Sequence, residues 1–231
     1  METDDICKLF RSKLPQIPVS TNRYDVEQHG QGESYHPMKP PWAVLTPSST
    51  EDIASLLHLC QQHRIPVIPF GAGTSVEGHV NALHGGITLD TSQLNSIHID
   101  PNGDAFAKVG AGVTRSRLNQ ELRYSGMQFV VDPGADATIG GMVACGASGT
   151  TAVHYGTMRQ NILAIECVLP DGTLANCGTN ALKSSAGYDL VSLMTGSEGT
   201  LGVITNVTVK LHPIPQHVAG AICVFEQLQQ A

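Results

Sequence analysis

The chain has 231 residues and a formal net charge of −7 at pH 7, because 20 acidic residues outnumber 13 basic ones. Nucleic-acid binding proteins cluster Lys and Arg into a basic surface. The basic residues here are scattered, so we expect no DNA or RNA partner. No stretch reaches the roughly 18 apolar residues of a membrane span, and the length suits one large domain or two small lobes.

The six cysteines lie far apart without a CxxC pair, which predicts reduced thiols in an intracellular protein. The first residues, METDDICKLFRSKL, have neither the basic start and apolar run of a signal peptide nor the Arg-rich composition of a transit peptide. We therefore expect a cytoplasmic protein, which a partner could still hold at a membrane. The ten histidines show no HExxH or Cys/His ligand spacing, so no metal site is expected.

Residues 1–36 are interpreted as an N-terminal arm. Residues 15–41 are rich in Pro, Gly and polar side chains, which predicts a segment that wraps around the protein rather than packing into it. Folding proper is expected to begin near Trp42.

A strand–helix–strand unit follows the arm. Ser48 and Glu51 fit a capping box at the start of a helix that runs to about His63. Its apolar residues recur at i, i+3, i+4 and i+7, which predicts one buried face made of Ile53, Leu56, Leu57 and Cys60. Strands are expected at residues 42–46, 65–69 and 87–90.

The next part of the chain has the signals of antiparallel sheet. Turns at Asn102-Gly103 and Asp171-Gly172, each between alternating apolar residues, predict two hairpins. Thr114 is expected to cap a helix that carries Leu118 and Leu122 and that Gly126 closes. Other expected elements are a strand at 128–131, a helix at 189–194 and a strand at 203–211.

Together these elements predict an α+β fold with two lobes. A small parallel α/β lobe covers about residues 37–92, and a larger, mostly antiparallel sheet lobe with helices covers about residues 93–215. A cofactor commonly binds in the crease between two such lobes.

Three segments are unusually dense in glycine: residues 69–78, 133–149 and 196–202. Of the 24 glycines, 21 lie between Gly71 and Gly202, in runs that we interpret as too crowded for a helix or a strand. Glycine runs can simply mark tight connections. Three such segments together favour a backbone surface for a long phosphorylated cofactor, with bare N–H groups on a pyrophosphate.

Two common phosphate-binding motifs are excluded by the first segment. A Walker A loop needs a lysine after its last glycine, and here His79 follows Gly78. A dinucleotide fingerprint needs its third glycine three residues after the second and a helix directly behind it. The gap from Gly73 to Gly78 is too long, and no helical periodicity follows.

Four ordered motifs carry a family resemblance: PFGAGTSVEGH, VDPGADATIGGMVACGASGTTAVHYGTMRQNIL, LPDGTL and SAGYDLVSLMTGSEGTLGVIT. They resemble the FAD-binding domain of vanillyl-alcohol oxidase type (PCMH-type) flavoproteins. The branch that the chain resembles most is that of FAD-linked D-lactate dehydrogenases and glycolate oxidase large subunits. The resemblance covers roughly residues 37–213.

By position, the resemblance implies three groups of FAD-binding residues. The first surrounds the pyrophosphate, the second lines the flavin and its ribityl chain, and the third closes over the nucleotide end. The members are Gly71, Ala72, Gly73, Thr74, Ser75, Gly78 and His79; Pro133, Gly134, Thr138, Gly140, Gly141, Gly146, Ser148 and Gly149; and Glu198, Gly199 and Ile204. Relatives with covalent flavin often carry a histidine where Thr74 stands, so non-covalent FAD is implied here.

The resemblance also implies a second domain, in which later histidine motifs supply a catalytic base and a metal site. Residues 216–231 would be its start. The family moves a hydride from the Cα of a 2-hydroxy acid to flavin N5. No catalytic base and no electron acceptor can be assigned to this chain, which we expect to be poor or inactive alone. The alternative is a non-catalytic FAD-binding module or subunit that acts only with another polypeptide.

Two further residues can each be interpreted in two ways. His154 is expected either to face the flavin or to pack structurally. Arg159 is expected either to balance an anionic flavin or substrate carboxylate, or to order a loop through a salt bridge.

Overall fold

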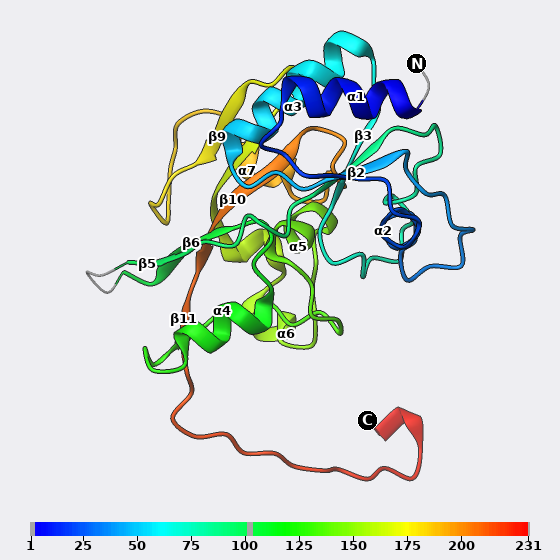
Figure 1. The fold of residues 1–231 in the computed structure, drawn as a ribbon. Helices are drawn as coiled ribbons and strands as arrows, with labels where there is room; N and C mark the ends of the chain where they lie inside the picture. Colours follow the sequence, from blue (N-terminus) through cyan, green and yellow to red (C-terminus); the bar gives the residue numbers. More distant parts are fainter. Residues whose placement is uncertain (1–2, 101–103, 231) are drawn as a thin grey trace.

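The computed structural model describes residues 3–100 and 104–230, and its strands form two principal sheets (Figure 1). The small sheet has the order β1-β2-β4-β3 and is parallel except for β1; its strands are Val19–Ser20, Ala43–Leu45, Ile87–Asp90 and Val67–Phe70. The large sheet has the order β5-β6-β10-β8-β9 and is antiparallel; its strands are Ile97–Ile99, Phe106–Gly110, Val203–Lys210, Ile162–Val168 and Leu174–Gly178. The predicted two-lobed α+β architecture is confirmed.

Helix α3 (Thr50–His63) forms as its apolar periodicity predicts. All four residues of the predicted face are buried. The predicted capping box is displaced by one residue: Ser49 is the N-cap, and its side chain accepts a hydrogen bond from the Asp52 amide. Ser48 instead donates its hydroxyl to the Asp52 carboxylate. The helix ends at Arg64, whose left-handed conformation directs the chain into β3.

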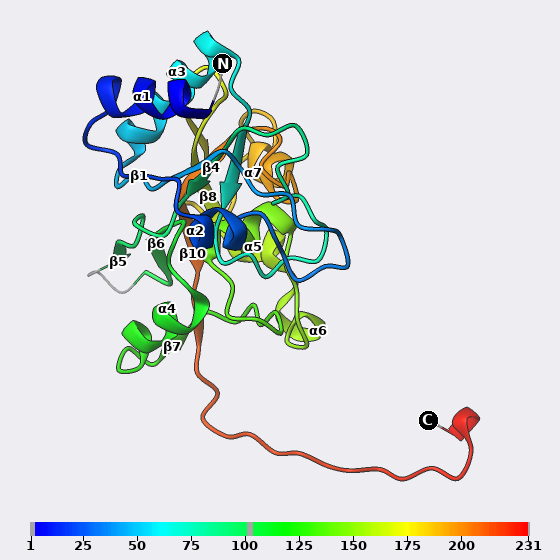
Figure 2. The same cartoon turned by 45° about the vertical axis from the view of Figure 1, so that its right-hand side comes forward.

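The N-terminal arm packs more than its composition suggests. Helix α1 (Thr3–Lys13) lies beside α3 (Figures 1 and 2) and buries Ile6 and Phe10 in the main core. The expectation that folding begins near Trp42 is therefore wrong, because an amphipathic helix precedes the Pro- and Gly-rich stretch. That stretch holds only β1 and the short helix α2 (Arg23–Gln28).

Most predicted elements of the second lobe are present. Strands β5 and β6 pair as a hairpin, and the predicted turn residues Asn102-Gly103 lie outside the described residues. Thr114 caps α4 (Arg115–Leu122), and Asp189 caps α7 (Leu190–Met194). Two short 3₁₀ helices are also present, at Met158–Asn161 and Leu228–Gln230.

The strand predicted at residues 128–131 is mostly absent. Only β7 (Met127–Gln128) pairs, with β11 (His212–Pro213). Beyond it, the side chain of Asn119 makes both backbone hydrogen bonds of Phe129, to the amide (2.8 Å) and to the carbonyl (3.0 Å). A side chain therefore takes the place of a neighbouring strand.

The second glycine segment contains the helix α5 (Ile139–Cys145), and a short helix, α6 (Ala152–Tyr155), follows it. The interpretation of this segment as too rich in glycine for a helix is wrong. A Cβ atom on Gly140 would lie 2.6 Å from the Ala111 Cβ atom. Glycine is required there for close packing of α5 against the chain that follows β6, and not because the backbone is irregular.

Glu166 on β8 connects the two lobes. Its carboxylate accepts hydrogen bonds from Asn206 (2.7 Å), from Lys108 (3.2 Å) and from Thr50, the first residue of α3 (3.2 Å). Burial alone would raise the pKa of Glu166, but these hydrogen bonds and the Lys108 charge outweigh burial and lower it. The ionised carboxylate therefore stabilises the folded protein.

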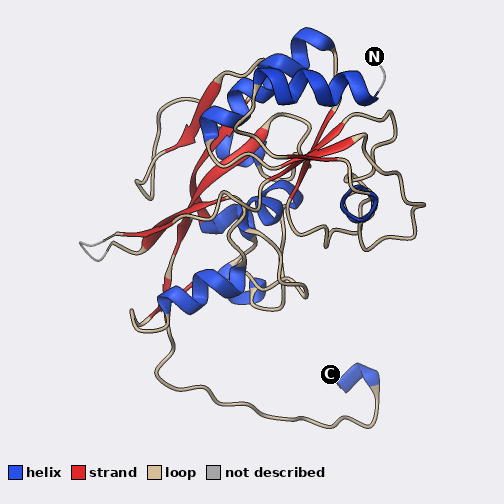
Figure 3. Ribbon diagram, viewed as in Figure 1, coloured by secondary structure: helices blue, strands red, loops and turns tan. Residues whose placement is uncertain are grey.

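The last described residues lead away from the body of the protein (Figures 1 and 3). Val218, Ile222 and Val224 are each at least 89% exposed there. Within the described residues, no helix is long and apolar enough to cross a membrane.

Replacing Glu166 by Gln should lower the free energy of unfolding by about 1–2 kcal/mol near neutral pH, because charge-assisted hydrogen bonds are weakened. The folded-state pKa is depressed, so this stabilisation exists above the unfolded pKa of about 4.3 and is lost as pH falls through the folded value. Urea unfolding at several pH values measures the change. The exposed Glu121→Gln is the control, and equal losses in both variants would contradict the assignment.

Candidate functional site

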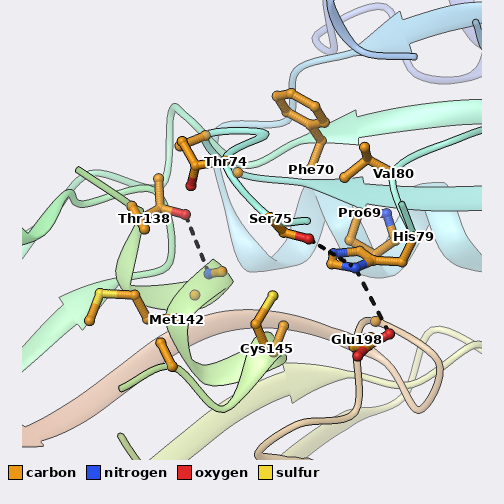
Figure 4. A pocket seen from close by; sticks show the side chains of 18 of the residues that line it. Pro69, Phe70, Thr74, Ser75, His79, Val80, Thr138, Met142, Cys145 and Glu198 are labelled. Carbon is orange, nitrogen blue, oxygen red and sulfur yellow. Dashed lines mark hydrogen bonds and ion pairs between the residues drawn. The ribbon is translucent and has the colours of Figure 1, made fainter. Parts of the chain in front are cut away.

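The three glycine-dense segments meet at one cavity of about 450 Å³. The first lobe contributes the loop after β3, and the second lobe contributes α5, its flanking loops and the turn before β10 (Figure 4). Sixteen of the eighteen residues singled out from the sequence line this cavity: Gly71, Ala72, Gly73, Thr74, Ser75, His79, Pro133, Gly134, Thr138, Gly140, Gly141, Gly146, Ser148, Glu198, Gly199 and Ile204. Gly78 and Gly149 do not.

The first loop lines the cavity and has backbone donors without a protein partner among the described residues. The amides of Ala72, Gly73, Thr74 and Ser75 donate no hydrogen bond to any described residue. Gly73 has φ +68°, and a Cβ atom there would lie 2.7 Å from the Phe70 ring. These amides are therefore available for an anionic ligand, and the loop conformation depends on glycine.

The second segment forms one wall through α5. Thr138 precedes the helix, and its hydroxyl oxygen accepts a hydrogen bond from the Gly141 amide (3.3 Å; Figure 4). The same oxygen lies so close to Gly71 that any side chain at that position would clash with it. Because Gly71 has no Cβ atom, the first loop can pack directly against Thr138 at the start of α5.

Asp132 fixes the bend before Pro133. Its carboxylate accepts hydrogen bonds from the Thr150 hydroxyl (2.8 Å) and from the Thr151 amide (3.0 Å). A Cβ atom on Gly149 would overlap the Asp132 backbone. Gly149, which was predicted to line the flavin, therefore serves this backbone packing.

The third turn is attached to α5. The amides of Gly196 and Glu198 donate to the carbonyls of Val143 and Ala144, both at 2.9 Å. Arg159 donates to the carbonyls of Ser192 and Thr195. Of the two interpretations of Arg159, loop ordering is the one that the contacts support, although the acceptors are carbonyl oxygens and not a carboxylate.

Titratable groups gather where the first loop faces the third turn. Ser75 donates its hydroxyl to Glu77 (2.5 Å), and this hydrogen bond lowers the pKa of the Glu77 carboxyl. His79 Nδ1 lies 3.9 Å from Glu198 Oε2. Burial, with smaller contributions from nearby carboxylates, raises the pKa of the Cys145 thiol to about 11.

Residues 29–39 form a strap: the sequence predicted that residues 15–41 wrap around the protein, but not that this part contacts the first loop. The strap runs behind the first loop: the Glu33 amide donates to the Ser75 carbonyl (3.2 Å), and the His36 ring occupies the space beside Gly78. A Cβ atom on Gly32 would lie 2.9 Å from the Ser75 carbonyl. Gly32 and Gly78 were the available signals, since each permits a close approach.

His29 anchors the start of the strap. Its Nδ1–H donates to the Asp25 carbonyl (2.8 Å), and its Nε2 lies 3.6 Å from Asp90, at the end of β4. The ring also contacts Phe70, which lines the cavity. Burial alone would lower the pKa of His29, but the contacts with Asp90 and Asp25 outweigh burial and raise it.

The arrangement defines an α+β domain that holds a nucleotide-type cofactor between two lobes. A family model described as "FAD binding domain" matches residues 41–178, more than half of the chain. The chain therefore belongs to this family of FAD-binding domains, and FAD is its cofactor.

Several curated proteins are similar to the chain. The probable D-lactate dehydrogenase, mitochondrial, of Danio rerio is 45% identical over 226 residues, which are 96% of this chain and 45% of the relative. The D-lactate dehydrogenase (cytochrome), mitochondrial, of Arabidopsis thaliana is 41% identical over 91% of this chain and 38% of the relative. The chain thus spans less than half the length of these relatives.

Solved structures share the fold. An alkyldihydroxyacetonephosphate synthase superposes with a TM-score of 0.80 over 94% of this chain and 41% of that one, at 22% identity. Physcomitrella patens BBE-like 1 gives a TM-score of 0.77 over 92% of this chain and 45% of that one, at 16% identity. At such identities the likeness establishes the fold alone.

Replacing Gly140 by Ala should destabilise the protein by about 1–3 kcal/mol, although alanine favours helices, because the added methyl group meets the Ala111 side chain. Gly134→Ala, in the same segment, should stay within about 0.5 kcal/mol of the parent, since nothing lies within 4 Å of its added Cβ atom. Thermal and urea unfolding without cofactor measure both. Equal effects would refute the packing role of Gly140.

Replacing His29 by Gln should cost about 1 kcal/mol of stability near pH 5.5 and less near pH 8.5. The folded-state pKa is raised, so the stabilisation is complete below the unfolded value of about 6.5 and disappears as pH rises through the folded value. Chemical unfolding at both pH values, with the exposed His98→Gln as control, tests this. A pH-independent loss would show that the charge of His29 is irrelevant.

Proposed function

We propose that this chain is the FAD-binding part of an FAD-dependent dehydrogenase that oxidises D-lactate or a related 2-hydroxy acid. The observation that carries the proposal is the convergence of three glycine-dense segments on one cavity. The similarity to proteins named D-lactate dehydrogenase, at 39–45% identity, supports the substrate class.

Each wall of the cavity has a role in this proposal. The free amides of residues 72–75, with the Thr74 hydroxyl, would hold the diphosphate of FAD. The bare backbone at Gly141, where an added Cβ atom would meet only the Thr138 hydroxyl oxygen, would admit the flat ring system. Asp132 would keep the Pro133 bend in position through its contacts with Thr150 and Thr151. The turn at Glu198 and Gly199 would close the nucleotide end.

When bound, FAD would accept the hydride that leaves the Cα atom of the hydroxy acid. The residues of this chain would orient the cofactor and exclude side chains from its surface. The base that takes the hydroxyl proton, like the substrate pocket, would be supplied by a C-terminal domain or by a partner subunit. The alternative function is a flavin-holding module that works only in complex with another polypeptide.

Binding is proposed to be non-covalent, because Thr74 occupies the position at which covalent relatives often carry histidine. Acid precipitation of the flavin-loaded protein should then release all of the yellow colour into the supernatant. Flavin that stays with the precipitate would contradict this.

The cytoplasmic location expected from the sequence stays a prediction. The names of several relatives include the word mitochondrial, which favours that organelle for the whole protein. Fractionation of cells that express the full-length coding sequence would decide between the two compartments.

Gly73→Ala should weaken FAD affinity by about tenfold or more, because a side chain at φ +68° strains the loop and meets the Phe70 ring. Gly126→Ala is a matched control, since Gly126 has φ +73° with nothing within 4 Å of an added Cβ atom and lies outside the cavity. It should change affinity by less than about twofold. Quenching of flavin fluorescence measures both, and similar losses would refute the assigned loop.

Anaerobic mixing with D-lactate separates the two functions. The flavin-loaded chain should bleach very slowly with D-lactate, because no base is assigned to it, and should bleach rapidly once the C-terminal half is joined in the same polypeptide. Restoration only by a separate subunit would favour the alternative module. Rapid turnover by residues 1–231 alone would refute the proposal that the base and the substrate pocket lie outside this chain.

A further inference from the structure

Three side chains with different metal-binding atoms meet at the cavity wall. Glu77 and His79 come from the first loop, and Cys145 is the last residue of α5. One ligand atom of each lies within 4.8 Å of the others. Figure 4 shows His79 and Cys145 on opposite sides of the same gap, with Glu198 beside His79.

The donor set is that of a zinc-type cation. Thiolate, imidazole and carboxylate are the ligands that Zn²⁺ prefers, whereas Mg²⁺ and Ca²⁺ prefer oxygen atoms alone. Bonds of about 2.0–2.3 Å in a tetrahedron place ligand atoms about 3.3–3.8 Å apart. The three ligand atoms, all within 4.8 Å of one another, therefore need to approach by about 1 Å or less to complete such a site.

Charge also favours a cation at this position. The carboxylates of Glu77 and Glu198 both lie at the cavity, and in the described part of the chain neither forms an ion pair with Lys or Arg. His79 is the neighbouring basic group, 3.9 Å from Glu198. A divalent cation would neutralise the pair of carboxylates.

We propose that the flavin-free protein binds one zinc-type cation through Cys145, His79 and Glu77, and that this cation and FAD exclude one another. The thiol proton leaves to solvent as the metal–sulfur bond forms, and no group is oxidised or reduced. Exclusion rests on the proposed FAD site: His79 belongs to the first loop, so ligation would draw that loop toward α5 and narrow the cavity. This proposed site differs from the expectation, based on the histidine spacing, that the chain has no metal site.

Cd²⁺ titrated into flavin-free protein tests the site, because a Cd²⁺–thiolate bond has a strong ultraviolet charge-transfer band. One equivalent should produce the band in the parent and in Cys223→Ser, whose cysteine lies in the exposed tail. Cys145→Ser should abolish the band, and His79→Ala should weaken binding about tenfold or more. Circular dichroism checks that each variant is folded, and Cys145→Ala replaces Cys145→Ser if that variant is not.

A band that persists without Cys145, or that never appears, would overturn the metal site. For exclusion, FAD is titrated against protein with and without Cd²⁺, and a chromophoric chelator measures the metal released. FAD should displace Cd²⁺ one for one. Equal FAD affinity in both samples would overturn exclusion. If metal-free protein binds no FAD, the proposed function fails together with exclusion, while the Cd²⁺ band still decides the metal site.

Discussion

The close approach of Gly140 to Ala111 is the constraint on which the cavity depends. It lets the first turn of α5 lie against the chain after β6, where the amides of Ile139 and Gly140 donate to the carbonyls of Val113 and Ala111 (2.8 and 2.9 Å). The far end of the same helix carries the third turn, through the carbonyls of Val143 and Ala144. Thr138, just before it, touches the first loop at Gly71. One short helix therefore sets the positions of all three glycine-dense segments.

The sequence predicted the fold well where a single local signal decides the structure. The apolar periodicity of α3, the cap Thr114, the short helix predicted at residues 189–194 and the two hairpins all describe elements as the structure has them, although Asp189 caps that short helix. Predictions failed where a distant partner decides. Helix α5 forms despite its glycines because Gly140 allows it to pack closely against Ala111. The backbone of Phe129 joins no strand because the side chain of Asn119 hydrogen-bonds to its amide and its carbonyl.

The candidate site, like the fold, was predicted only in part from the sequence. Nearly all of the residues chosen from the motifs line the cavity, because glycine is required wherever backbones or a cofactor approach closely. The motif positions did not separate Gly149, which packs on Asp132, from the residues that face the cavity. Nor did they reveal the strap or the three metal-binding side chains, because these groups are brought together by folding and share no recognisable spacing.

The strap has a practical consequence for anyone who prepares this domain. The family match begins at residue 41, after the hydrogen bonds and ring contacts of His29, Glu33 and His36. The family match ends at residue 178, before the turn at residues 196–202, whose amides donate hydrogen bonds to carbonyls of α5. An expression fragment trimmed to the match would keep the first two glycine-dense segments but lose the third, together with the strap that contacts the first loop. Boundaries chosen by homology alone would thus yield a recognisable domain with an unsupported cofactor loop.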